Sequence, residues 1–311
     1  MDINNNQNIY YSSESSCSEC NLLGFIERET PLIIGERTNV SGSKLFKKFI
    51  RERDISGAVK IAKSQVRNGA KILDVNLTDS ETDENSNIDL FYPELIKSVK
   101  VPVMVDSVSG ANTIERALKY LRCGTIVNSV NLGNIRRFGE VVKVAEKYES
   151  MIVVLLIDQN GIAVSLEDKI SVAKKSYKIL VEEFGVLPSK IIFDCLVLPI
   201  CSGAKDYYMS AKNSIDSIPL IKDECSDART VLGVSNCSFG LPYFVRKILN
   251  SIFFHHAVER GLDMAIIDSE NLIEYSSISY EERKLCENLI FNNSEQNIDT
   301  FSQFYSLISG C

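Results

Sequence analysis

The stretch LIIGERTN, at residues 32–39, begins as an apolar β-strand and ends in a cluster of polar and charged side chains. A strand of a parallel sheet that is buried on both faces should be apolar throughout. The same change recurs in five further stretches, which read ILDVN (72–76), VMVDS (103–107), IVNS (126–129), IIFD (191–194) and GVSN (233–236). Polar groups at the carboxyl ends of parallel strands are where a (β/α)8 TIM barrel places its active site. The sequence therefore predicts both this fold and the face that carries the site.

Strand and helix signals alternate over residues 31–268, as is typical of βα units in a parallel sheet. We expect eight strands, at residues 31–35, 71–77, 102–108, 124–130, 151–158, 190–197, 229–235 and 263–268. Apolar residues at helical spacing lie between them, for example over 58–66, 170–184 and 245–260. Eight strands favour a closed barrel, and a doubly wound open sheet is the alternative.

The barrel is expected to occupy residues 30–275, between a flexible leader (1–29) and a helical tail (276–311). The leader is rich in Asn and Ser and shows no periodicity. In the tail, Ser279-Tyr280-Glu281-Glu282 has the form of a helix start. Asn292-Asn293 is expected to end that helix, and a second is expected from Thr300.

The composition is that of an ordinary globular protein, with 311 residues, 45% hydrophobic and 24% charged, and a net charge of −7. Because there is no basic stripe, nucleic acid is not an expected partner. The apolar runs are shorter than a membrane span and the amino terminus lacks a signal-peptide layout, so we expect a cytoplasmic protein with no membrane partner. Nine cysteines, an odd number, fit free thiols in a reducing compartment. The Cys17-x-x-Cys20 pair alone is a weak signal for a metal site.

The polar side chains at the strand ends are mostly carboxylates and amides. They carry Asp74, Asp106 and Asp194, and the amides Asn76, Asn128 and Asn236. No basic residue stands beside these carboxylates in the sequence, so together they suit a neutral heterocycle with several N–H donors. The alternative is that each side chain caps the helix that follows its strand. For any single residue this is about as plausible as a ligand-binding role, but it is less plausible for all six.

Two other kinds of site are less favoured by the sequence. His255 and His256 are adjacent on an expected helix, where neighbouring residues do not share a face, so we expect no metal site from them. Cys195 and Cys237, which flank two of the strand-end ligands, are expected to be small buried fillers rather than nucleophiles.

The quoted motifs, taken in order, resemble a known family. IGERTNVSGSK (34–44), DVN (74–76), VDS (105–107), IVNS (126–129), IIFD (191–194) and GVSNCSF (233–239) are similar to the methyltetrahydrofolate-binding domain of cobalamin-dependent methionine synthase. The stand-alone methyltetrahydrofolate–corrinoid methyltransferases share them. The likeness covers residues 31–275, and residues 280–305 are similar to the helical segment that follows that domain.

The resemblance implies that the chain binds 5-methyltetrahydrofolate and passes its N5-methyl group to a corrinoid, a cobalamin carried by a partner protein. Asn236, Asp194 and Asp106 would act in catalysis, with Asn236 beside N5. The pterin would contact Asp74, Asn76, Asp106, Asn128 and Asp194, and the benzoyl-glutamate side Gly42, Ser43 and Lys44. Arg246 matches an arginine that reaches the folate from the helix after the seventh strand.

The sequence departs from the family's pattern at three places. The turn after the second strand reads LTDSET (77–82), Asp194 is followed by Cys195 instead of Pro, and the loop FGLPYF (239–244) lacks an expected arginine. The chain contains no homocysteine-binding zinc module and no cobalamin-binding motif, which suggests the folate half of a split methionine-synthase-like system. Two alternatives stay open, a dihydropteroate-synthase-like pterin enzyme and a non-catalytic folate-binding protein, and so does a homodimer.

Overall fold

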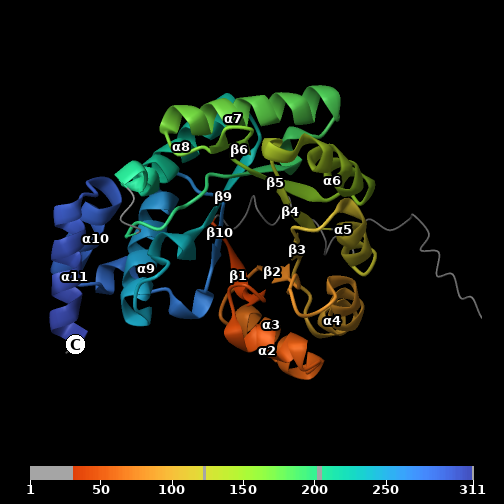
Figure 1. The fold of residues 1–311 in the computed structure, drawn as a ribbon, viewed down its shortest axis with the longest axis horizontal. Helices are drawn as coiled ribbons and strands as arrows, with labels where there is room; N and C mark the ends of the chain where they lie inside the picture. Colours follow the sequence, from red (N-terminus) through yellow and green to blue (C-terminus); the bar gives the residue numbers. More distant parts are fainter. Residues whose placement is uncertain (1–30, 122–123, 202–204, 310–311) are drawn as a thin grey trace, which may run out of the picture.

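In the computed structural model, which describes residues 31–121, 124–201 and 205–309, eight parallel strands form a closed barrel (Figure 1). Around the barrel the strands follow the order β1, β10, β9, β8, β5, β4, β3, β2. Their bounds are β1 Leu32–Asn39, β2 Ile72–Asn76, β3 Val103–Asp106, β4 Ile126–Val130, β5 Met151–Leu155, β8 Ile191–Asp194, β9 Arg229–Gly233 and β10 Met264–Ile267. The predicted TIM barrel is confirmed, and the open-sheet alternative is wrong because β1 pairs with both β2 and β10.

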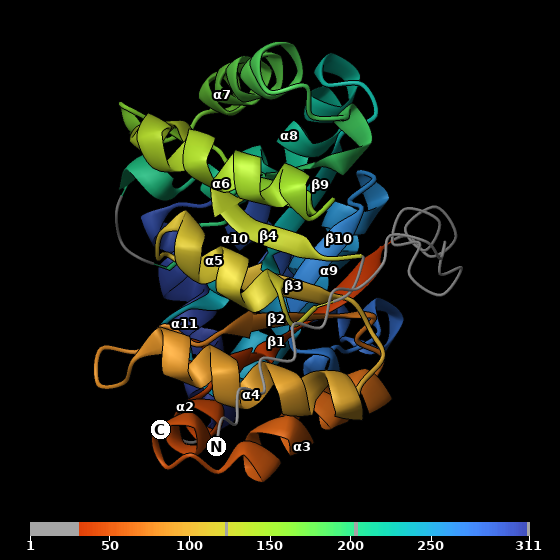
Figure 2. The same ribbon diagram turned by 90° about the vertical axis from the view of Figure 1, so that its right-hand side faces the viewer.

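Helices surround the barrel on its outside, as the view along its side shows (Figure 2). They are α2 Lys44–Arg51, α3 Ile55–Arg67, α4 Glu84–Ser98, α5 Ala111–Leu118, α6 Ile135–Lys147, α7 Leu166–Lys178, α8 Ser210–Glu224 and α9 Tyr243–Glu259. A short antiparallel hairpin of β6 (Ile157–Asp158) and β7 (Gly161–Ile162), which the sequence did not predict, follows β5. Most of the helices begin at a capping side chain, for example Ser43 at α2 and Ser165 at α7. These capping side chains fix the residues at which the helices begin.

The core has two layers, which explains the continuous apolar character of the strands. A small inner cluster fills the barrel itself and includes Ile34, Ile72, Met104 and Ile192, all 0% exposed. A larger outer cluster lies between the sheet and the helices. Because successive strand residues point to opposite faces, both must be apolar until the strand emerges from the barrel. The strands therefore become polar where they leave the inner apolar layer, at the rim of the barrel.

β1 is longer than expected and contains a bulge. Gly35 pairs with Leu73 but Thr38 pairs with Val75, so β1 uses one more residue than β2 over this interval. The buried Gln65 of α3 holds the bulge, since its Oε1 accepts a hydrogen bond from the Arg37 backbone N–H at 2.6 Å. A Cβ at Gly35 would lie 2.6 Å from the same oxygen, so only glycine fits there.

Two further helices, α10 (Tyr280–Phe291) and α11 (Glu295–Ser309), lie beside α9 at one side of the barrel (Figure 1). The predicted helix start is confirmed, because Ser279 and Glu282 form a capping box. The break at Asn292-Asn293 is also found, but the second helix begins five residues before Thr300. The Asn293 amide donates a hydrogen bond to the Ile200 carbonyl oxygen at 3.0 Å, which ties the helical pair to the loop after β8.

Two expectations about the amino terminus concern residues outside the described part. The leader and the Cys17-x-x-Cys20 pair both lie in residues 1–30. Among the described residues, no helix is long and apolar enough to cross a membrane.

Candidate active site

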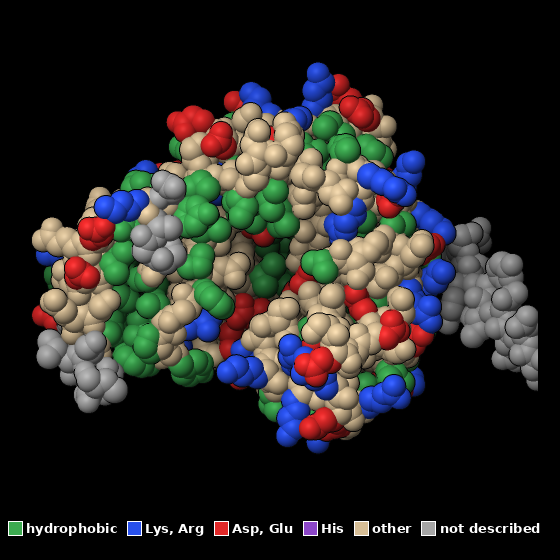
Figure 3. All heavy atoms as spheres, viewed as in Figure 1, with side chains coloured by type: hydrophobic (Ala, Val, Ile, Leu, Met, Phe, Trp, Pro, Cys, Tyr) green, Lys and Arg blue, Asp and Glu red, His purple; other side chains and the backbone are tan. Residues whose placement is uncertain are grey.

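The carboxyl ends of the barrel strands open onto a hollow at the centre of the face shown in Figure 3, and acidic side chains lie inside it. Four carboxylates project from three neighbouring strands and one opposite strand. They are Glu36 from β1, Asp74 from β2, Asp106 from β3 and Asp194 from β8. Because the barrel register fixes the strand ends, residues far apart in the chain meet here.

Asp74 and Asp106 form a hydrogen-bonded pair through one amide. Asn39 Nδ2 donates to Asp74 Oδ2 at 3.0 Å and to Asp106 Oδ2 at 2.9 Å. Asn76 Nδ2 adds a second donor to Asp106 Oδ2, also at 2.9 Å. Asn128 interacts with Asp74 as well, but Asp74 Oδ1 stays buried and accepts no hydrogen bond from any residue the structure describes. The pair therefore contains one buried acceptor that the described residues leave unsatisfied.

Burial and mutual repulsion hold both carboxyls in a less acidic state. Burial, and next the charge of Asp106, raise the pKa of Asp74 well above its usual range. Burial raises the pKa of Asp106 to about 6, against the opposing effect of the Asn76 and Asn39 amides. Two close carboxylates favour a shared proton, since both cannot ionise easily in a desolvated site. The pair can consequently accept or share a proton near neutral pH.

Glu36 lies beside this pair, on the neighbouring strand β1. Ser235 Oγ donates to Glu36 Oε1 at 2.9 Å, which joins β1 to the turn after β9. Burial raises the pKa of Glu36 to about 7, and the nearby charge of Asp268 contributes in the same direction. Arg246 of α9 donates to the Ser235 carbonyl oxygen at 3.4 Å and to Ser238 Oγ at 3.2 Å, so its guanidinium supports that turn.

Asp194 lies apart from the Asp74–Asp106 pair, at the end of β8 on the opposite side of the mouth. The Leu196 backbone N–H donates to Asp194 Oδ1 at 2.8 Å, a local turn within the loop after β8. Burial raises the pKa of Asp194 to about 6, opposed by that bond and by the charge of Lys169. Asp194 thus differs from the Asp74–Asp106 pair, because the charged group that acts on it is a cation.

The remaining candidate residues line the rim. Asn236 lies in the turn after β9, and its side chain is exposed and makes no hydrogen bond within the described chain. Gly42 is exposed in the loop after β1 and Lys44 is exposed at the first residue of α2, whereas Ser43 is buried and caps α2, its Oγ accepting from the Phe46 N–H. The structure therefore leaves Asn236 and Lys44 available for a ligand and gives Ser43 a structural role as well.

The capping interpretation fails for the central pair. The oxygens of Asp74 and Asp106 accept bonds from side-chain amides of other strands, and neither residue caps a helix. Asn76 does accept a local bond from the Thr78 backbone N–H at 2.9 Å, but its Nδ2 still reaches Asp106. Convergence across strands, and not helix termination, explains these polar ends.

Several site residues were missed at the sequence level. Glu36 and Asn39 lie inside the quoted stretch 32–39, but no role was predicted for them from the sequence. Both are polar residues at a strand end, which is the signal that identified Asp74, Asp106 and Asp194. Two cations on helices, Arg137 and Lys169, act through their charge on Asp106 and Asp194, which corrects the expectation that the carboxylates lack basic neighbours. Arg137 donates to the carbonyl oxygens of Ser107 and Ser129, both at 2.7 Å, and so joins the ends of β3 and β4.

The two cysteines beside site residues are packed as neutral side chains. Cys195 and Cys237 are both 0% exposed. Burial raises the pKa of the Cys195 thiol to about 12 and that of Cys237 well above its usual range. Since the thiolate is the nucleophile, neither thiol is activated.

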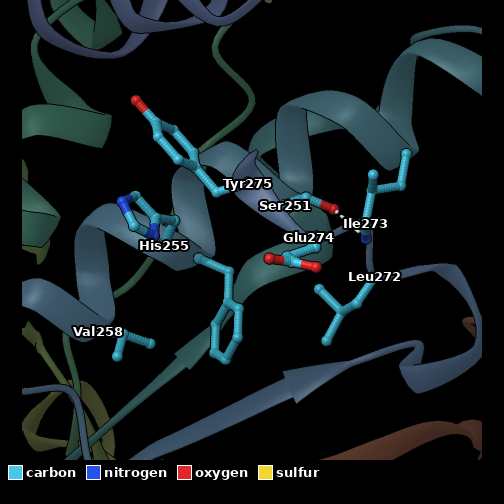
Figure 4. Close-up of a pocket in the computed structure, with 8 residues that line it drawn as sticks. Ser251, His255, Val258, Leu272, Ile273, Glu274 and Tyr275 are labelled. Carbon is cyan, nitrogen blue, oxygen red and sulfur yellow. Dashed lines mark hydrogen bonds between the residues drawn. The ribbon is translucent and has the colours of Figure 1, made fainter. Parts of the chain in front are cut away.

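A separate cavity of about 280 Å³ lies between α9 and the segment 272–275 (Figure 4). His255, stacked on Tyr275 with ring centroids 3.8 Å apart, forms one wall, and Phe254, Val258 and Leu272 form the apolar part. No strand-end residue of the mouth lines this cavity. It holds one carboxylate, Glu274, and lacks the convergent polar groups of the barrel mouth.

A comparison with known families matches residues 35–268 to the family described as "Pterin binding enzyme". The chain belongs to the pterin-binding enzymes. The matched segment begins in β1 and ends just after β10, so the strand ends that form the mouth lie within it. The family assignment agrees with a site built from buried carboxylates and amides, the groups that pair with the N–H edge of a pterin.

Among curated proteins, this pterin-binding chain is similar to the methionine synthases of Mycobacterium tuberculosis (strain ATCC 25618 / H37Rv) and Mycobacterium leprae (strain TN). Each is 30% identical over 290 residues, which is 92% of this chain. The chain spans 24% of the length of these relatives. The resemblance noted in the motifs is thus confirmed over nearly the whole chain.

Among solved structures, the barrel is similar to dihydropteroate synthases. One from Vibrio fischeri ES114 has a TM-score of 0.57 at 13% identity, covering 83% of this chain and 92% of that one. One from Burkholderia cenocepacia has a TM-score of 0.55 at 16% identity, covering 91% and 93%. One from Yersinia pestis, with a pterine-sulfa conjugate, has a TM-score of 0.53 at 14% identity, covering 84% and 93%. At these identities the likeness establishes the fold.

Proposed function

We propose that the protein is a methyltransferase that binds 5-methyltetrahydrofolate in the barrel mouth and passes its N5-methyl group to a corrinoid carried by a partner protein. The observation that carries this proposal is the Asp74–Asp106 pair, in which amides engage the two Oδ2 atoms and the buried Asp74 Oδ1 accepts no hydrogen bond from the described residues. An unsatisfied buried acceptor costs free energy, so the site is completed by a ligand that donates N–H. The amino-pyrimidinone edge of a pterin is such a donor.

The remaining roles follow from where the side chains lie. Asp194 would accept further N–H groups of the pterin, and Asn128 would assist beside Asp74. Asn236 would lie at N5, where its free amide can follow the change in charge during transfer. Gly42, exposed in the loop after β1, and Lys44, exposed at the start of α2, would contact the benzoyl-glutamate part. Arg246 would act through the Ser235 turn that carries Asn236.

The chemistry needs a proton at N5, because a tertiary amine is a poor leaving group. The Asp106 carboxyl, with its pKa raised to about 6, and Glu36, with its pKa raised to about 7, can both hold a proton near neutral pH. Asn236 cannot donate a proton as an acid but can stabilise a protonated N5. A reduced corrinoid supplies the nucleophile that takes the methyl group.

The rim of the mouth supports docking of the partner that carries the corrinoid. Four large apolar side chains are exposed in the segments that follow the strands, with Val108 and Phe239 in loops and Ile135 and Tyr243 at the first residues of α6 and α9. Exposed apolar groups around a polar site are typical of a surface covered by another protein. The mycobacterial methionine synthases, of which this chain spans about a quarter, have the room for such a module within one polypeptide.

Calorimetric titration with 5-methyltetrahydrofolate tests the binding part of the proposal. Asp106→Ala should weaken binding by about 1–3 kcal/mol, since it removes an acceptor from the site and leaves Asn76 Nδ2 without its partner. Asp223→Ala, an exposed position on α8, is the matched control and should bind as the wild type does. Unchanged affinity in a folded Asp106→Ala protein would remove the pair from the site.

Methyl transfer is tested separately by adding free cob(I)alamin to the protein loaded with methyltetrahydrofolate. Appearance of methylcobalamin supports the proposal, and binding without transfer to free or protein-borne corrinoid favours a non-catalytic folate-binding protein. The shared fold makes a dihydropteroate-synthase-like reaction the second candidate. Formation of dihydropteroate by the purified chain would establish that candidate instead.

A further inference from the structure

An arginine at the rim of the mouth has a fixed backbone and a largely free head group. Arg37 lies in the bulge of β1, next to Glu36, and its backbone N–H donates to Gln65 Oε1 at 2.6 Å. Its side chain is 39% exposed, and Nη1 donates to the Gly42 carbonyl oxygen at 3.3 Å. No other hydrogen bond joins this guanidinium to the described residues, although a guanidinium carries five N–H donors. Arg37 therefore holds unused donors beside the loop after β1.

The neighbouring carboxylate of Asp268 does not use these donors. Arg37 Nε lies 3.8 Å from Asp268 Oδ2, which is beyond hydrogen-bond distance. The oxygens of Asp268 are occupied within their own turn, where they accept from the Glu270 backbone N–H at 3.2 Å and from Asn271 Nδ2 at 2.6 Å. A partly exposed ion pair stabilises a fold very little, and backbone pairing already joins β1 to β10. Closing the barrel is thus not a sufficient role for Arg37.

The other cations near the strand-end carboxylates are engaged by the chain itself. Arg137 donates to three backbone carbonyl oxygens, and the buried Lys169 donates to two in the loop after β8. Arg246 donates to one carbonyl oxygen and one hydroxyl in the turn after β9. Basic side chains are visible at the edge of the hollow, beside the acidic ones inside it (Figure 3). Of these four cations, Arg37 is the one whose head group is suited to bind an anion.

The ligand of the proposed function carries its negative charge at the end that leaves the mouth. The glutamate of 5-methyltetrahydrofolate has two carboxylates, which are ionised at neutral pH. The carboxylates inside the mouth repel them, so the tail needs a cation at the rim. In the proposed function the benzoyl-glutamate part contacts Gly42, and the Arg37 guanidinium lies against that residue. A guanidinium binds a carboxylate through two parallel N–H donors, which gives the contact both strength and direction.

We propose that Arg37 is a specificity-determining residue, which binds a carboxylate of the glutamate tail and so selects folates over pterins that lack the tail. The inference rests on the proposed function for its ligand and adds the group that recognises the tail. On binding, the guanidinium would turn from Asp268 to a carboxylate that can approach within hydrogen-bond distance. The backbone bond to Gln65 keeps the residue in place while the side chain moves.

Calorimetric titration with two ligands tests the inference. One is 5-methyltetrahydrofolate, and the other is 5,6-dimethyltetrahydropterin, which keeps the methylated ring but has no benzoyl-glutamate part. Arg37→Met should bind the folate at least about tenfold more weakly, because it loses a charge-assisted contact, and should bind the tail-less pterin as the wild type does. Arg260→Met is the matched control, since Arg260 is 54% exposed, lies just after α9 and pairs with Asp216 at 3.5 Å. It should bind both ligands as the wild type does.

The outcomes separate the inference from the proposed function. If the wild type binds neither ligand, the proposed function fails and the inference fails with it. If the wild type binds the folate and a folded Arg37→Met protein binds it equally well, only the inference is overturned. An equal loss of affinity for both ligands would mean that Arg37 acts on the pterin site through β1, and this result would also overturn the inference.

Salt dependence gives a second readout, which a purely structural role would not change. The wild-type affinity for the folate should fall between about 50 mM and about 300 mM KCl, as the ions screen the contact between guanidinium and carboxylate. The fall should be smaller in Arg37→Met, and the tail-less pterin should be nearly unaffected in both proteins. If Arg37→Met melts early, Arg37→Gln, which keeps a polar head group, replaces it in both measurements. A salt dependence equal to that of the wild type in the folded variant would overturn the inference.

Discussion

Replacing Glu36 by Gln should raise the free energy of unfolding at alkaline pH and leave it nearly unchanged in acid. Burial raises the pKa of Glu36 from 4.5 to about 7 in the folded protein, and the unfolded chain returns to the ordinary value. A carboxyl with a raised folded-state pKa contributes nothing below pH 4.5, and its ionisation destabilises the fold increasingly up to pH 7. The difference of about 2.5 units, at about 1.4 kcal/mol per unit, amounts to about 3 kcal/mol.

Urea unfolding at pH 4.5 and pH 8.5 measures this effect. Protonated Glu and Gln have nearly the same shape, so the two proteins should agree within about 0.5 kcal/mol at pH 4.5. At pH 8.5 the Glu36→Gln protein should be more stable by about 3 kcal/mol. Glu183→Gln, at an exposed position after α7, is the control and should show no such difference. A Glu36→Gln protein no more stable than the wild type at pH 8.5 would refute the reasoning from burial.

Three further predictions address other parts of the mouth. Asn39→Ala removes the amide shared by Asp74 and Asp106, so the pKa of Asp106 should rise above about 6 in a carboxyl NMR titration. An unchanged pKa would exclude the hydrogen bond from Asn39 to Asp106. Asn236→Ala should lower the single-turnover rate of methyl transfer to cob(I)alamin roughly 10²-fold, more than it weakens folate binding, whereas early melting with a normal rate would indicate a structural role. Arg51→Ala should lower the melting temperature at pH 7 but less at pH 2. Arg51 lowers the pKa of Asp79 to about 2, and the stabilisation from this ion pair disappears as the carboxyl protonates. An equal loss at both pH values would contradict this reasoning.

The strands could be predicted because their signals are local. Each apolar run ends at its own polar residues, and all eight expected strands are found within a few residues of their predicted bounds. Helices α4 and α8 were not among the named helical spans, and each contains an internal proline, Pro93 or Pro219, a residue that normally ends a helix. Their packing against neighbouring helices outweighs that local cost.

The site could be predicted only in part, for a different reason. The strand-end rule names the carboxylates, but which of them share an amide depends on the order of strands around the barrel. Asn39 reaches Asp106 across 67 residues of sequence, and Glu36 meets Ser235 across 199. Lys169 carries no signal at all in the sequence, since a lysine in the first turns of a helix is ordinarily exposed.

The bulge in β1 has a consequence for how this strand can change over time. In a regular strand two residues separated by an odd number of positions face opposite sides, yet Glu36 and Asn39, three apart, both reach the barrel mouth. The extra residue between Gly35 and Thr38 brings them to the same side. Insertion or deletion of a single residue here would turn one of them into the hydrophobic layer under α3. A change of length in this part of β1 would therefore have to come in steps of two.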